Sequence, residues 1–159
     1  MKTLGAGQGF MRNPDFERKA SMQERSINCE KRIEQHMRSR MEDLQRLWIA
    51  YCKGIETLED LGSIHEYGLC FDYVAPETFD GQKEGYFRYQ ISWGGPSDEF
   101  RFFANPDFSH HRIEYWFLDW FDGAHRVLSG ADEALLSELW DWFRECEAPQ
   151  AAFNKTQDH

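Results

Sequence analysis

The chain has 159 residues, of which 28 are acidic and 18 are basic, giving a formal net charge of −10. This length suits a single domain that needs no metal or disulfide to fold, and no apolar stretch is long enough to span a bilayer. The four cysteines lie far apart without a Cys-x-x-Cys pair, which excludes a zinc ribbon or a dithiol redox motif. The opening residues lack the apolar run of a signal peptide, so we expect a cytoplasmic protein. We also expect no cofactor.

The charge is unevenly spread along the chain. Residues 1–55 carry a net charge of +4, whereas residues 56–159 carry −14. A body this acidic repels phosphates at long range and attracts basic protein surfaces. We therefore expect a protein partner with a basic surface, no direct DNA binding by the body and no membrane partner.

Residues 1–20 lack sustained apolar periodicity and are expected to form a flexible arm. Beyond the arm, apolar residues recur at three- and four-residue steps, which predicts one amphipathic helix of about seven turns. They are Ile33, Met37, Leu44, Leu47, Trp48, Tyr51 and Cys52. Gly54 is expected to stop this helix, and a second short helix is predicted over residues 56–61.

The pattern then changes to strict alternation of apolar and polar residues, which is typical of half-buried strands. The predicted strands cover residues 69–73, 87–93, 100–102, 113–117 and 125–128. An Asp122-Gly123 pair predicts the hairpin turn that leads into the fifth, short strand. Because no helix-length segment separates the strands, they are expected to pair antiparallel.

Helical periodicity resumes over residues 133–147, where an apolar arc lies beside an acidic face. The arc consists of Leu135, Leu139, Trp142, Phe143 and Cys146. Pro149 is expected to end the helix, leaving residues 149–159 as a disordered tail. The chain thus predicts an α+β fold for residues 21–148, with an antiparallel four- or five-stranded sheet packed by the long N-terminal helix and the C-terminal helix.

Two strands raise the question of which faces are buried. The second strand places four apolar residues on one face, which we expect to pack under the helices: Phe87, Tyr89, Ile91 and Trp93. The fourth strand is apolar on both sides, with Trp116, Leu118 and Trp120 opposite Ile113, Tyr115 and Phe117. Either this strand is covered on both faces, or Trp116 and Trp120 belong to an interaction patch.

The best catalytic candidate is a metal or acid-base site in a group of carboxylates and imidazoles. Its members are Asp119, Asp122, His125, His110 and His111. No His-Glu-x-x-His spacing is present, and ordinary turn and surface roles also account for these residues. We therefore expect no catalytic residue and no metal, and keep a small enzyme at this group as an alternative.

The arginines of the first helix, among them Arg38 and Arg46, are interspersed with acidic residues and predict a solvated face. Two functional alternatives remain. The helix can bind nucleic acid as a regulator, or it can meet the acidic body of a second copy in a homodimer.

An acidic row on the C-terminal helix has two interpretations. Glu138, Asp141 and Glu145 advance about 10 Å along the helix, which is comparable with one or two phosphate steps of a nucleic-acid strand. Such a row can occupy a basic groove by mimicking nucleic acid. A solvated helix face is the other interpretation.

Three segments resemble small uncharacterised proteins of bacterial plasmids and integrating elements, over about residues 64–146. They are YGLCFDYVAP (67–76), YFRYQISWGGPSDEFRFF (86–103) and EYWFLDWFDGA (114–124). The resemblance implies no catalytic residues, only that such elements often encode small acidic proteins that block restriction or CRISPR nucleases. With the charge, it predicts an anti-CRISPR or anti-restriction inhibitor of a host defence complex. The expected partner-binding residues are Glu138, Asp141, Glu145, Trp116 and Trp120.

Overall fold

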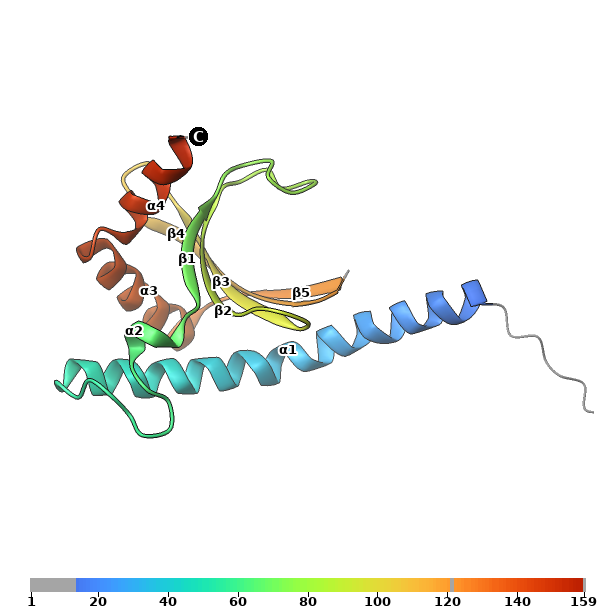
Figure 1. The fold of residues 1–159 in the computed structure, drawn as a ribbon, viewed down its shortest axis with the longest axis horizontal. Coiled ribbons are helices and arrows are strands. Elements are labelled where there is room, and N and C mark those ends of the chain that lie inside the picture. The colour runs from blue at the N-terminus through green and yellow to red at the C-terminus, as the bar shows by residue number, and fades with distance from the viewer. Residues whose placement is uncertain (1–13, 121, 159) are drawn as a thin grey trace, which may run out of the picture.

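The computed structural model describes residues 14–120 and 122–158, with side chains from residue 29 onward. The elements in chain order are α1 (Pro14–Cys52), α2 (Ile64–Tyr67), β1 (Cys70–Val74), β2 (Tyr86–Ser92), β3 (Ser97–Ala104), β4 (His110–Asp119), β5 (Asp122–Val127), α3 (Gly130–Glu145) and α4 (Ala148–Gln157). Helices thus lie at both ends of the chain, with every described strand between them (Figure 1). No described helix has an apolar stretch long enough to cross a bilayer.

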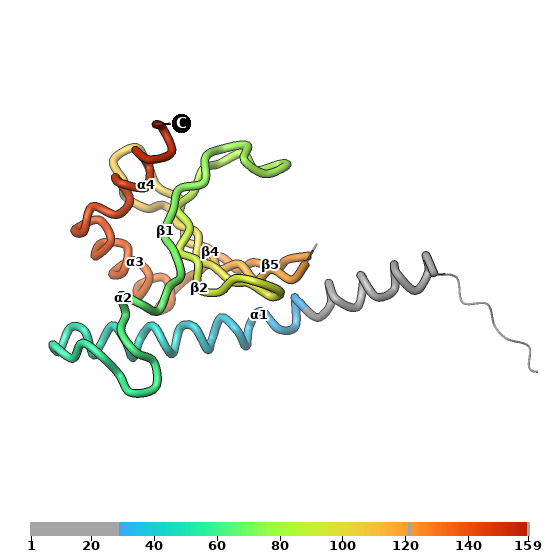
Figure 2. Tube along the Cα trace, viewed as in Figure 1, coloured from blue at the N-terminus to red at the C-terminus, as the bar shows by residue number. Residues whose placement is uncertain are grey.

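The described strands form one antiparallel five-stranded sheet in the order β1-β2-β3-β4-β5. Each strand pairs with the next one in sequence, as expected when only turns and short loops connect them. The predicted α+β fold with an antiparallel sheet is therefore confirmed, and the fifth strand is present. Figure 2 shows the sheet curving strongly, with the connection between β1 and β2 projecting over its concave side.

Helices α1, α3 and α4 lie on the convex side of the sheet (Figure 1). The alternating residues of β2, β3 and β4 that point to this side form the core with the apolar stripe of α1. The largest side chains that are fully buried in this core are Trp140, Tyr115, Phe100, Phe102, Phe117, Ile33 and Leu44. Burying each large apolar side chain of this kind contributes about 1.5–3 kcal/mol.

The helical segments differ from the expectation in four places. Helix α1 begins at Pro14, inside the range expected to be a flexible arm, while residues 1–13 lie outside the described residues. Residues 56–61 form no helix but an irregular segment with a turn closed by a bridge between Leu58 and Gly62, and the short helix follows at α2. Residues 149–159 were expected to be a disordered tail, but α4 extends to Gln157. The fully buried residues of α3 are Leu136, Leu139 and Trp140, and of the expected apolar arc only Leu139 is among them.

Candidate functional site

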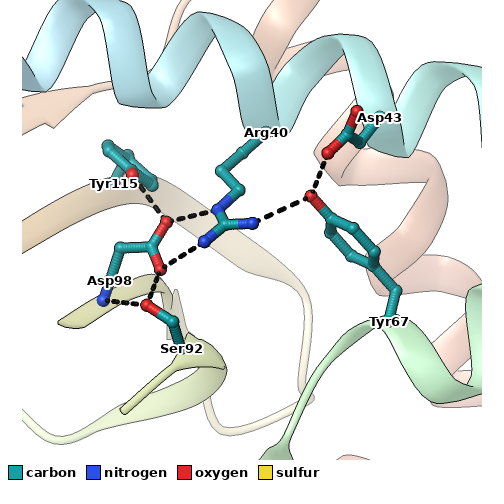
Figure 3. A network of polar contacts seen from close by, with 6 residues as sticks. All are labelled: Arg40, Asp43, Tyr67, Ser92, Asp98 and Tyr115. Atoms are coloured by element: carbon teal, nitrogen blue, oxygen red, sulfur yellow. Dashed lines mark hydrogen bonds and ion pairs between the residues drawn. The ribbon is translucent and has the colours of Figure 1, made fainter. Parts of the chain in front are cut away.

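A buried carboxylate fixes the turn between β2 and β3 to helix α1 (Figure 3). Asp98 is 2% exposed, and its two oxygens accept from Arg40 Nε at 2.7 Å and Nη2 at 3.2 Å. Tyr115 donates its hydroxyl hydrogen to the same carboxylate at 2.7 Å. Ser92 donates to Asp98 and accepts from the Asp98 backbone N–H. Because Ser92 and Asp98 flank the turn, these bonds hold its two ends in place.

The same network continues to α2. Arg40 Nη1 donates to the Tyr67 hydroxyl at 3.4 Å, and that hydroxyl donates to Asp43 at 2.8 Å (Figure 3). Burial raises the pKa of Tyr67 to about 12, against the opposing effect of Arg40. The network therefore contains a neutral tyrosine at neutral pH and joins α1, α2 and the β2–β3 hairpin.

We predict that alkaline pH weakens this junction. Since the folded-state pKa of Tyr67 lies above its unfolded value, the contribution of Tyr67 to stability is complete below about pH 10 and is lost between about pH 10 and 12. Urea unfolding across this range should show a falling free energy of unfolding. A Tyr67→Phe variant should fall less steeply, and an unchanged slope would contradict the assignment.

Two tryptophans project from the end of the sheet that this network supports. Trp93 is 77% exposed and Trp120 is 74% exposed. With Leu118 they border a hollow of about 350 Å³, and we call these three residues the tryptophan tip. A Cβ at Gly95 would lie 3.4 Å from Trp120 Nε1, so the indole rests against the glycine turn. Trp120 has φ 58°, an uncommon backbone conformation for a bulky residue.

Only part of this surface was predicted from the sequence. Trp93 was expected to join the core face of the second strand, but β2 ends at Ser92 and Trp93 lies in the turn. The Gly94-Gly95-Pro96 run directly after it was the available signal. Trp120 is exposed, whereas Trp116 is partly buried, so neither of the two alternatives describes both tryptophans.

The concave face of the sheet carries a charged row beside aromatic side chains. The register aligns Asp72, Arg88, Arg101 and Glu114 across four strands. Arg88 pairs with Asp72 at 2.6 Å, and Arg101 pairs with Glu99 at 2.8 Å. The two arginines thus lie side by side, each neutralised by a carboxylate.

Aromatic rings enclose Arg101. Its guanidinium carbon lies 4.4 Å from the ring centroid of Tyr86 and 3.7 Å from that of Trp116. Trp116 also stacks on His125, with centroids 4.4 Å apart, and its Nε1 donates to Glu114 at 2.9 Å. Cation–π contacts of this kind stabilise a cation that has lost water. Trp116 is therefore half-buried in an internal stack, unlike Trp120.

A cavity of about 520 Å³ lies over this stack, beneath the connection between β1 and β2. Tyr86 lines it, yet the Tyr86 hydroxyl is buried and has no hydrogen-bond partner among the described residues. A buried hydroxyl without a partner destabilises the folded state.

Replacing Tyr86 with phenylalanine should therefore raise the free energy of unfolding by about 1 kcal/mol. Chemical denaturation measures the change. Tyr115→Phe is the matched control, because the Tyr115 hydroxyl bonds to Asp98 and its loss should be destabilising. Equal destabilisation by both substitutions would mean that the Tyr86 hydroxyl has a partner in solution.

The five catalytic candidate residues are not gathered in one place, although Asp119 and Asp122 are neighbours. His110 begins β4 and Asp119 ends it, so they lie at opposite ends of a ten-residue strand. His110 hydrogen-bonds Ser137 at 3.0 Å, and Asp119 lies 3.4 Å from Arg32. His125 is stacked on a tryptophan, His111 lies 3.9 Å from Glu84, and Asp122 pairs with Asp119 across β4 and β5. Within the described ranges no three His, Cys, Asp or Glu residues are placed to hold a metal.

The acidic row of α3 is exposed, but two of its members contact other side chains. Glu138 accepts from Trp48 Nε1 at 2.7 Å, and Asp141 lies 3.8 Å from Arg144. The Glu145 side chain is exposed. Glu138 therefore has a structural contact besides any role in binding.

Four arginines in the described part of α1 pair with acidic residues of the same chain. The pairs are Arg32–Asp119, Arg38–Asp132, Arg40–Asp98 and Arg46–Asp60. These four basic side chains of α1 thus pair with acidic side chains from later in the same chain. A second copy is not needed to neutralise these arginines.

Comparisons with known proteins add no assignment. A scan against protein-family models, a search of curated proteins and a search of solved structures found no match to this chain.

Proposed function

We propose that this chain is a small acidic protein-binding factor that inhibits a host complex targeting nucleic acid, such as a CRISPR or restriction nuclease. The observation that carries the proposal is the tryptophan tip, where two indoles remain about three-quarters exposed on a well-supported turn region. Large exposed apolar side chains mark interaction sites, and tryptophan is enriched among the residues that dominate binding energy.

Charge supports the class of partner. A complex that binds DNA or RNA carries basic residues for the phosphates. The net charge of −14 over residues 56–159 would attract such a surface and speed association. We place Trp93 beside Trp120 in the contact surface, and we assign Trp116 to internal packing because it is stacked between Arg101 and His125.

Within this proposal, the acidic row contributes by steering and partial mimicry of nucleic acid. Asp141 and Glu145 are exposed, whereas Glu138 also holds Trp48. Charges at the rim of an interface change the association rate more than the final affinity. Binding to the partner should therefore slow with rising salt.

A transformation assay tests the function. Bacterial strains that each carry one CRISPR or restriction system receive a targeted or an untargeted plasmid, with or without this protein. We expect the protein to restore transformation by the targeted plasmid in at least one strain, and the Trp93→Ala/Trp120→Ala variant to restore it less. If no strain in a broad panel responds and no basic complex co-purifies with the protein, the proposal is wrong.

A further inference from the structure

Four aromatic side chains line part of a second cavity, of about 570 Å³, between the sheet and α4. Their rings contact one another in a closed cycle. The centroid distances are 4.9 Å for Tyr73–Phe87, 6.0 Å for Phe87–Phe108, 6.1 Å for Phe108–Phe153 and 5.1 Å for Tyr73–Phe153. Most of these pairs are tilted or edge-to-face, the arrangement in which aromatic rings attract one another. One wall of the cavity is therefore a packed cluster of aromatic rings, contributed by β1, β2, α4 and the loop between β3 and β4.

The lining of this cavity carries no charge. The remaining lining residues are Gly85, Ala104, Asn105, Pro106 and Asn154. An anion would lose its hydration here without gaining an opposite charge. The lining therefore disfavours an anion, in contrast to the cavity over Arg101.

The Tyr73 hydroxyl is one of the polar groups at this cavity. A Cβ at Gly85 would lie only 2.2 Å from the Tyr73 hydroxyl, so this hydroxyl fits here only because residue 85 has no side chain. No group among the described residues hydrogen-bonds that hydroxyl. A tyrosine hydroxyl is protonated at neutral pH, and burial raises the pKa of Tyr73 above its ordinary value. Tyr73 can thus donate or accept one hydrogen bond.

We propose that this cavity binds a small uncharged aromatic molecule, which packs against the four rings and forms one hydrogen bond with Tyr73. The volume lies within the range of pockets that take small organic ligands. Such a site is separate from the tryptophan tip and does not depend on the proposed inhibitor function.

The test compares 2-naphthol with 2-naphthoate, which share a ring system but differ in charge at neutral pH. We expect 2-naphthol to raise the melting temperature of the full chain in a concentration-dependent way, since a ligand that binds only the folded state stabilises it. The naphthoate anion should give no shift. An equal shift from both compounds, or no shift from 2-naphthol, would overturn the proposal.

A cavity-filling variant locates the site. Ala104 lines the cavity, so the larger side chain of Ala104→Phe should fill it and abolish the shift by 2-naphthol without lowering the melting temperature of the free protein. Ala104→Leu serves the same purpose if phenylalanine prevents folding. Trp93→Ala/Trp120→Ala should keep the full shift, because the tip lies elsewhere. A shift that survives in the folded Ala104 variants, or disappears in the tryptophan variant, would show that 2-naphthol binds elsewhere and would overturn the site.

Discussion

Replacing Asp98 with alanine should lower the free energy of unfolding by about 3–5 kcal/mol, because it leaves a largely desolvated guanidinium without its carboxylate. Arg40 loses both of its hydrogen bonds to Asp98, and the Tyr115 and Ser92 hydroxyls lose their acceptor. The side chains of Arg40 and Asp98 are 27% and 2% exposed, so water replaces these partners poorly. Urea or guanidinium denaturation at neutral pH measures the loss.

The chain provides a matched control in the exposed pair of Arg46 and Asp60. That pair has similar geometry, with contacts of 2.8 and 3.0 Å, but its side chains are 53% and 59% exposed. Asp60→Ala should therefore cost far less than Asp98→Ala, since exposed ion pairs contribute little. In an Arg40→Ala background, Asp98→Ala should also cost less, because no guanidinium is then left without its carboxylate. Equal losses at Asp60 and Asp98 would contradict the role of burial.

The sheet could be predicted because its physical signal is local. In β2, Phe87, Tyr89 and Ile91 alternate with polar residues, and all three are buried against the helices. Alternation requires only that one face of a strand is covered, so it appears within a few residues of sequence. The end of α1 near Gly54 is local in the same sense, since that glycine adopts a φ of +81°.

The candidate site was harder to predict from the sequence, because it depends on contacts between residues that are distant in the chain. Arg40 and Asp98 are 58 positions apart, and nothing in either neighbourhood indicates that they meet. Trp93 continues the alternation of β2, and only the β2–β3 turn removes it from the core. Helix α4 packs Phe153 against Tyr73 and Phe108. Phe153 is the one large apolar residue of α4, so this helix shows no periodic apolar pattern. Helical periodicity needs several apolar residues in one stripe.

Removing both exposed indoles should weaken binding to the partner by about 100-fold or more, since tryptophan at the centre of an interface commonly contributes at least about 2 kcal/mol. The double variant Trp93→Ala/Trp120→Ala should still fold, because both side chains are already mostly in water. Its free energy of unfolding should stay within about 0.5 kcal/mol of the wild type. Titration calorimetry with the defence complex identified by the transformation assay measures the affinity.

The comparison that decides between the tip and the acidic row is Asp141→Lys/Glu145→Lys. Glu138 is left unchanged in this variant because it accepts a hydrogen bond from Trp48. If the tip is the contact surface, this reversal should mainly slow association, and the slowing should be largest at low salt. The tryptophan variant should instead dissociate faster. If the lysine variant fails to bind and the tryptophan variant binds like the wild type, the partner recognises the acidic face of α3. Nucleic-acid mimicry by α3 would then account for binding, and the exposed indoles would need another explanation.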